Sequence, residues 1–144
     1  MSIAIRSVFF HAVLLALLLC CARLAWSVEL IVHPGVPATE LSRPLARLIL
    51  GAKVTSWEDG SRIRVFVMPD ESPLHQEMAK GILDLYPYQL RAAWDRVIYT
   101  GIGQAPIQLA NESEMRKQVA STPGAIGYVG RVYNNDKVRA LPVR

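Results

Sequence analysis

The chain has 144 residues, of which 51% are hydrophobic and 19% charged, and its formal net charge is +4. This length suits one globular domain, and the apolar content excludes a disordered chain. So small a net charge is too mild to argue for binding to nucleic acid or to an anionic membrane.

Residues 1–27 are predicted to be a secretory signal peptide. A positive charge at Arg6 precedes an apolar stretch, and Ala25-Trp26-Ser27 fits the small-x-small pattern of signal peptidase, so cleavage is expected before Val28. The alternative is an uncleaved membrane anchor, for which the apolar stretch is short and is interrupted near its end by Arg23. Cleavage predicts a periplasmic protein.

The predicted mature domain, residues 28–144, contains neither of the two cysteines, Cys20 and Cys21. A disulfide framework, a cysteine metal site and a thiol nucleophile are therefore excluded for this domain. A lipid anchor on either cysteine is disfavoured because bulky residues precede both. The signal peptide carries two basic residues and no acidic one, so its removal lowers the net charge from +4 to +2. The mature domain must be stabilised by its core, and no nucleic-acid partner is expected.

The mature domain is predicted to begin with a strand and a helix. Leu30-Ile31-Val32 is an apolar run that ends at a turn and is predicted to be a buried strand. Ser42 is expected to cap the helix that follows, and Gly51 to close it as a left-handed cap. The inner face of this helix is predicted to hold Leu45, Leu48 and Ile49.

The stretch from Val65 to His75 is predicted to be a strand, a turn and a helix start. Residues 62–67 become fully apolar, as a central strand does, and Ser72-Pro73 then begins a helix that is expected to run to about Leu85. The first N–H groups of a helix have no partner within the helix and can bind an anion. The alternative is that Ser72 is only a helix cap. His75 is expected to be an exposed residue of the first turn.

Further helices and strands complete the pattern. A helix is expected from about Tyr88 to Val97, and another begins at Asn111, with Glu114 completing a capping box. Residues 125–129 are predicted to be a buried strand and 138–143 the last strand. This alternation predicts an α/β fold with a small mixed sheet flanked by helices.

No constellation of catalytic or metal-binding residues is evident in the mature domain. Its two histidines, His33 and His75, cannot make a metal cluster, and no nucleophile–base pair is present. Glu58-Asp59 and Asp70-Glu71 lie in predicted turns, where acidic residues are ordinary. We therefore expect a protein that is not an enzyme and has no cofactor.

Three motifs resemble the phosphate-binding proteins of ABC transporters. Leu48–Ile63 is similar to the family's IFLGKITKWNDG segment, Trp94 lies where the family has a tryptophan, and Thr122–Val129 is similar to TPGAIGYV. The resemblance spans about residues 31–132. It implies one lobe of a type II periplasmic binding protein, because the family has two lobes and the chain matches one.

The resemblance also implies where an anion would bind. The family holds its anion with a segment similar to Arg-Ser-Asp-Gly-Ser-Gly-Thr, and residues 68–74 correspond to it here. Ser72 is kept, whereas Met68, Pro73 and Leu74 replace the family's Arg, Gly and Thr. The candidate anion-binding residues are therefore Ser72, Leu74 and His75. Charge-assisted hydrogen bonds contribute about 1.5–3 kcal/mol each, so loss of the Arg predicts weak binding.

The resemblance implies a non-catalytic module that binds phosphate or another small anion weakly, for an ABC-type uptake or sensing system. Its partner would be a permease or another envelope protein. The alternative is an envelope interaction protein that kept the fold and lost the ligand, with self-association replacing the missing lobe. An enzyme is the least supported reading.

Overall fold

The computed structural model describes residues 27–144, so the predicted signal peptide lies, apart from its last residue, outside the described residues. No helix in the described part of the chain is long and apolar enough to cross a membrane. The elements in chain order are β1 (Glu29–Val32), α2 (Arg43–Leu50), β2 (Arg64–Val67), α3 (Pro73–Glu77), the π-helix η1 (Met78–Ile82), α4 (Pro87–Thr100), β3 (Ile107–Gln108), α5 (Glu112–Ser121), β4 (Ala125–Val129) and β5 (Arg139–Ala140).

The five strands form one mixed sheet in the order β3-β2-β4-β1-β5. β2 is parallel to both β3 and β4, whereas β1 is antiparallel to β4 and to β5. In the register, Glu29 lies opposite Val129 and Arg64 opposite Ala125. Every residue of β4 is buried, as expected for a central strand covered on both faces. The predicted α/β class is confirmed.

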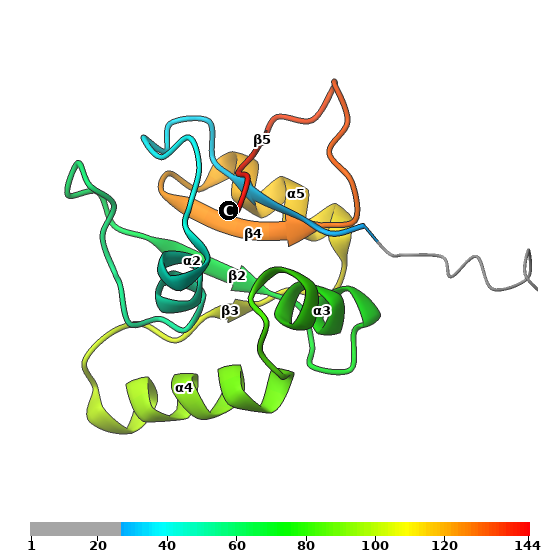
Figure 1. Cartoon of the computed structure of the whole chain (residues 1–144). Helices are drawn as coiled ribbons and strands as arrows, with labels where there is room; N and C mark the ends of the chain where they lie inside the picture. Colours follow the sequence, from blue (N-terminus) through cyan, green and yellow to red (C-terminus); the bar gives the residue numbers. More distant parts are fainter. Residues whose placement is uncertain (1–26) are drawn as a thin grey trace, which may run out of the picture.

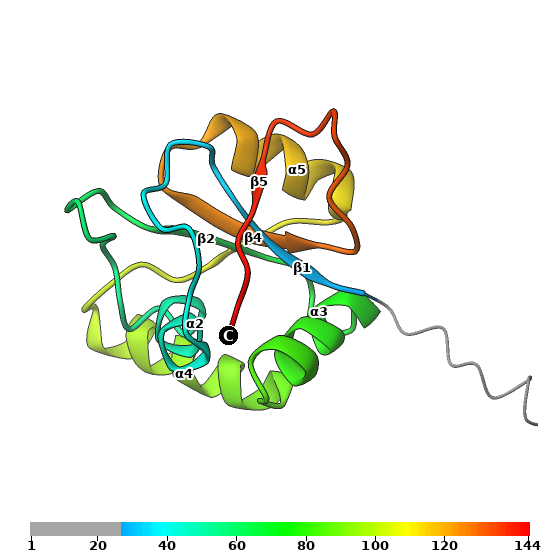
Figure 2. The same ribbon diagram turned by 45° about the horizontal axis from the view of Figure 1, so that its top comes forward.

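Helices cover the two faces of the sheet unequally. α5 lies alone on one face, and α2, α3 and α4 cover the other, as Figure 1 and Figure 2 show from two directions. Met115 and Val119 of α5 are fully buried against the sheet. A Cβ atom at Gly127 of β4 would lie 2.5 Å from Sδ of Met115, so the absence of a side chain there lets α5 approach the sheet closely.

The first helix differs from its prediction at two points. Its inner face is formed by Ala46, Ile49 and Leu50, while Leu48 is 41% exposed. Residues three and four apart share a helix face, and Leu48 lies outside the face set by these three. Gly51 is not left-handed (φ −79°), and the chain reverses one residue later, at Ala52 with φ 59°.

The helix that begins at Ser72 changes its winding after one turn. Residues 73–77 are α-helical, and η1 then continues with wider turns, in which the Leu83 N–H donates to the Met78 carbonyl. Sequence reasoning predicted a helix here but not the π-helix. η1 ends at Ile82, before the predicted end near Leu85.

The last strand is shorter than predicted and is followed by a paired tail. β5 contains Arg139 and Ala140 only, because Pro142 has no N–H to extend the ladder. The tail instead lies beside the segment that leads into α2, where the Leu41 N–H donates to the Pro142 carbonyl and the Arg43 N–H to that of Arg144. Figure 2 shows this tail ending next to α2.

Candidate functional site at the carboxyl end of the sheet

Two helices begin at the edge of the sheet where the parallel strands end. α3 follows β2 and α5 follows β3, so both N-termini face one groove of about 400 Å³, which we call the strand-end groove. Its lining residues are Met68, Ser72, Pro73, Leu74, Ala110, Asn111, Glu112 and Ser113. Crevices outside the carboxyl ends of parallel strands are the usual ligand sites of α/β folds. The groove therefore contains two of the three candidate anion-binding residues, Ser72 and Leu74.

The first turn of α3 is largely closed to an anion. The Ser72 hydroxyl accepts the His75 N–H at 3.5 Å and lies 3.7 Å from Sδ of Met68, so its oxygen already caps the helix. Pro73 has no N–H, and the Leu74 side chain is only 4% exposed. In this turn, the Leu74 N–H has no acceptor among the described residues and remains available as a donor.

Side chains of the protein itself bond one backbone N–H in the first turn of α5 and two N–H groups beside it. The Asn111 side chain accepts the Glu114 N–H at 2.9 Å, which confirms the predicted cap. The Glu114 carboxylate accepts the N–H of Ala110, at 2.9 Å, rather than that of Asn111, so the capping box is shifted by one residue. The Glu112 carboxylate accepts the N–H of Gly130, which follows β4. Carboxylates of the chain itself therefore occupy backbone donors at this edge.

The groove also lacks a cation to attract an anion. Met68, at the position of the family's Arg, is 3% exposed, and its N–H donates to the Tyr128 hydroxyl. Arg116 lies nearby, but it pairs with Asp136 at 2.6 Å and with Glu112 at 3.6 Å. Its guanidinium also lies 5.3 Å from the ring centre of Tyr133. Glu112 is therefore the one charged side chain that lines the groove, and its charge repels a dianion.

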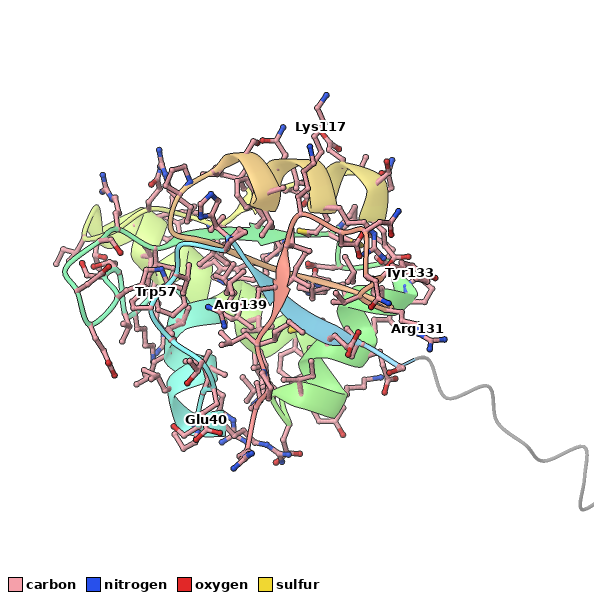
Figure 3. The ribbon with its side chains drawn as sticks, turned by 90° about the horizontal axis from the view of Figure 1, so that it is seen from above. Glu40, Trp57, Lys117, Arg131, Tyr133 and Arg139 are labelled. Atoms are coloured by element: carbon pink, nitrogen blue, oxygen red, sulfur yellow. The ribbon has the colours of Figure 1, made fainter. Side chains whose placement is uncertain are left out.

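Figure 3 shows the surroundings of this edge. Arg131 and Tyr133 lie together at one end of the molecule, while Trp57 and Glu40 lie at the other end. The Arg131 carbonyl accepts a hydrogen bond of 2.7 Å from Arg116, which holds the Arg116 side chain of α5 against the loop that contains Arg131.

His75 is buried beneath the groove, and the expectation that it is exposed is wrong. It is 0% exposed, because its ring packs between the rings of Trp94 and Tyr128, with both centroids 5.9 Å away. Nδ1 lies 2.6 Å from the Tyr128 hydroxyl. Since that hydroxyl accepts the Met68 N–H at 2.6 Å, it donates its own proton to Nδ1, which places the histidine proton on Nε2.

The Nε2 atom of His75 faces a carboxylate without a hydrogen bond. Asp70 Oδ1 is 3.7 Å away, and Nε2 has no hydrogen-bond partner among the described residues. Asp70 is instead held by Arg91, with contacts of 2.7 and 3.1 Å. The bidentate bond to Asp70 raises the pKa of Arg91.

Burial keeps both members of the histidine–tyrosine pair neutral. Burial lowers the pKa of His75, although the Asp70 carboxylate opposes this, and burial raises the pKa of Tyr128. A neutral, buried pair cannot reach a substrate, so we assign it to holding β2, β4 and α3 together. Sequence reasoning missed this network, because Tyr128 and His75 are far apart in the chain. Residues 27–144 contain no group of three or more His, Cys, Asp or Glu residues that could hold a metal ion.

Comparisons with known proteins support the fold. No family model matches the sequence, and no curated protein matches it. Solved structures do match, among them an ABC-type phosphate transport receptor from Vibrio cholerae, with a TM-score of 0.62 and 16% identity. A putative phosphate ABC transporter substrate-binding protein with bound phosphate, from Clostridium perfringens, has a TM-score of 0.64 and 21% identity. PstS from Borrelia burgdorferi has a TM-score of 0.61 and 15% identity.

The match covers most of this chain but less than half of each of these proteins. It covers 81%, 81% and 82% of this chain and 46%, 44% and 47% of the three solved chains. The predicted resemblance is therefore confirmed at the level of the fold: the chain is similar to one part of a phosphate ABC transporter substrate-binding protein.

Proposed function

We propose that this protein is an exported, non-catalytic module that kept one lobe of the substrate-binding-protein fold and acts by binding a partner protein in the cell envelope. The observation that carries the proposal is that side chains of the protein itself already bond several backbone N–H groups around the strand-end groove. Ser72, Asn111 and Glu112 occupy the backbone N–H groups of His75, Glu114 and Gly130. An anion could bind these three N–H groups only by displacing the side chains that accept them, and the described residues that line the groove include no cation in place of the family's Arg.

Weak phosphate binding is the second candidate. The likeness to a solved protein with bound phosphate and the position of Ser72 and the Leu74 N–H in the groove favour it. In this reading the protein would present the anion to an ABC permease or to a sensor, and Ser72, Leu74 and His75 would be its site. Because His75 is buried, it would act only by positioning the first turn of α3.

Isothermal titration calorimetry with inorganic phosphate separates the two candidates. If the protein acts only by binding a partner protein, no saturable heat is expected at millimolar phosphate. The variant Ser72→Ala tests the groove, and Ser42→Ala is its matched control, since Ser42 caps α2 at 3.4 Å and does not line the groove. Saturable heat that disappears in Ser72→Ala and persists in Ser42→Ala would contradict the first candidate and support phosphate binding.

The partner in this proposal is either another envelope protein or a second copy of the chain. The match covers under half of each solved neighbour, so a second copy could supply a surface like the one that the rest of the neighbour provides. Light scattering of the purified protein would give a dimer mass if the protein self-associates. A monomer at all concentrations would contradict self-association and leave a different envelope protein as the partner.

Export is tested separately. Fractionation of producing cells should place the protein in the periplasm, and sequencing of the mature N-terminus should give Val28 as the first residue. A membrane-bound chain that still carries residues 1–27 would instead support a retained anchor.

A further inference from the structure

A second groove lies between η1 and the beginning of α4, away from the residues that line the strand-end groove. It has a volume of about 450 Å³, and we call it the tyrosine groove because Tyr86 and Tyr88 form one wall. The other residues that line it are Asp70, Gln76, Lys80, Pro87 and Arg91.

The two tyrosines form a rigid and exposed aromatic surface. Tyr86 is 56% and Tyr88 69% exposed, and their rings stack with centroids 5.8 Å apart at an angle of 12°. Their backbone is fixed, because Pro87 stands between them and the Tyr86 N–H donates to the Gln89 side chain at 2.8 Å. A tyrosine held in this way offers a large contact area at little cost in conformational entropy.

The polar side of the groove is equally well fixed. Asp70 and Arg91 form a bidentate pair, and the Arg91 guanidinium lies 4.9 Å from the ring centre of Trp94, which is itself buried. Gln76 donates from Nε2 to the Asp70 carbonyl at 3.3 Å, which leaves its amide oxygen as an acceptor. Planar carboxylate, guanidinium and amide groups side by side present the donors and acceptors that match adjacent hydroxyl groups.

One positive charge of the groove is left without a counter-charge. Lys80 of η1 lies 5.9 Å from the ring centre of Tyr86 and forms no ion pair with any residue from 27 to 144. Asp70 and Arg91 neutralise one another, so Lys80 gives the lining a net positive charge. π-Helices are rare and are found frequently at functional sites, and η1 is the element that carries this lysine.

From these observations we infer that the tyrosine groove is a binding site for a saccharide that carries a carboxylate. The apolar C–H face of a sugar ring would pack on Tyr88, and its hydroxyl groups would bind the fixed Asp70–Arg91 pair and the Gln76 oxygen. The carboxylate would lie near the Lys80 ammonium. A neutral sugar would lose the last contact, so the groove selects an acidic saccharide.

The experiment is an NMR titration of the purified, ¹⁵N-labelled protein with trigalacturonate, and with maltotriose as the neutral comparison. We expect saturable shifts of the amides of residues 80–91 with trigalacturonate and weaker binding of maltotriose. Removal of one stacking ring costs about tenfold in affinity, so Tyr88→Ala should raise Kd by about that factor. Lys80→Gln should weaken the binding of trigalacturonate and leave that of maltotriose unchanged.

The matched control is Tyr99→Ala. Tyr99 lies on the same helix and is 90% exposed, but it does not line the groove, so its loss should leave Kd unchanged. Circular dichroism would show that the variants keep the fold, as expected for exposed positions. The inference is overturned by a lack of saturable shifts at millimolar trigalacturonate. It is also overturned by shifts confined to the strand-end groove, or by equal losses of affinity in Tyr88→Ala and Tyr99→Ala.

Discussion

The hydroxyl of Tyr128 lies 2.6 Å from Nδ1 of His75 and accepts the Met68 N–H at 2.6 Å, so one oxygen joins β4, α3 and the end of β2. The tyrosine is fully buried, as is the histidine. In an interior, a polar group that loses its partner costs its full desolvation free energy. The position of α3 relative to the sheet therefore depends on this oxygen.

Tyr128→Phe should lower the free energy of unfolding by about 1–3 kcal/mol, because the Met68 N–H and His75 Nδ1 both lose their partner in a buried site. Denaturation in urea measures the change. Tyr133→Phe is the matched control, since Tyr133 is 55% exposed, and its effect should stay within about 0.5 kcal/mol. Equal stabilities of the two variants would show that the buried hydroxyl contributes nothing.

Stability should fall as the pH is lowered through the range where an unfolded histidine binds its proton. Burial lowers the pKa of His75 in the folded state below its ordinary value of 6.5. Below that value the unfolded chain takes up a proton that the folded chain does not, so acid favours unfolding. The loss begins as the pH falls through 6.5 and stops growing below the lowered pKa of the folded state.

Urea denaturation at a series of pH values measures this slope. His75→Asn should flatten it, since the asparagine oxygen can accept from Tyr128 in place of Nδ1 and does not titrate. His33→Asn is the control, because His33 is the other histidine of the described residues and lies outside this network. A slope that persists in His75→Asn and disappears in His33→Asn would contradict the assignment.

Arg91→Gln should raise the pKa of His75 toward its ordinary value. Burial is the main cause of the lowered pKa, the Asp70 carboxylate raises it and the Arg91 guanidinium lowers it further, so removal of Arg91 leaves only burial to oppose the carboxylate. An NMR titration of the histidine ring protons measures the shift. Arg96→Gln, on the same helix, is the control and should leave the pKa of His75 unchanged. A lower pKa in Arg91→Gln would be the contrary result.

Gly124→Ala should destabilise the protein much more than Gly60→Ala. Both glycines have left-handed φ angles, +75° and +83°, so an alanine is strained at either position by about 1 kcal/mol. At Gly124, however, a Cβ atom would lie 2.1 Å from the Arg62 carbonyl oxygen, whereas nothing lies within 4 Å at Gly60. Thermal unfolding of both variants isolates the cost of the close contact, and equal melting temperatures would show that the loop moves aside.

Sequence reasoning succeeded where the determining interactions are local. Ser42, Ser72 and Asn111 each cap the helix predicted to begin there, because a cap depends on residues three positions away. The buried strand at 125–129 was equally clear, since every residue of it is small or apolar. The motifs that resemble a family identified the fold through such local signals.

The state of the candidate site could not be predicted in this way. Glu112 reaches Gly130, 18 positions away, and His75 is buried by Tyr128, 53 positions away. Such contacts form only when the sheet brings distant residues together, so the periodicity and spacing of residues in the sequence cannot predict them. These contacts occupy backbone N–H groups around the strand-end groove. The residues Met68, Pro73 and Leu74 at the family's ligand positions indicated a weakened site but could not show these contacts.

The strand order has a consequence for the timing of folding. β1 is the first strand of the domain, but its two neighbours, β4 and β5, are the last two. Glu29 finds its place only opposite Val129, so a growing chain cannot complete the sheet until almost all of it has been synthesised. A chain that cannot complete its sheet early stays unfolded for longer, and this would suit the export proposed above, in which the chain crosses the membrane before it folds.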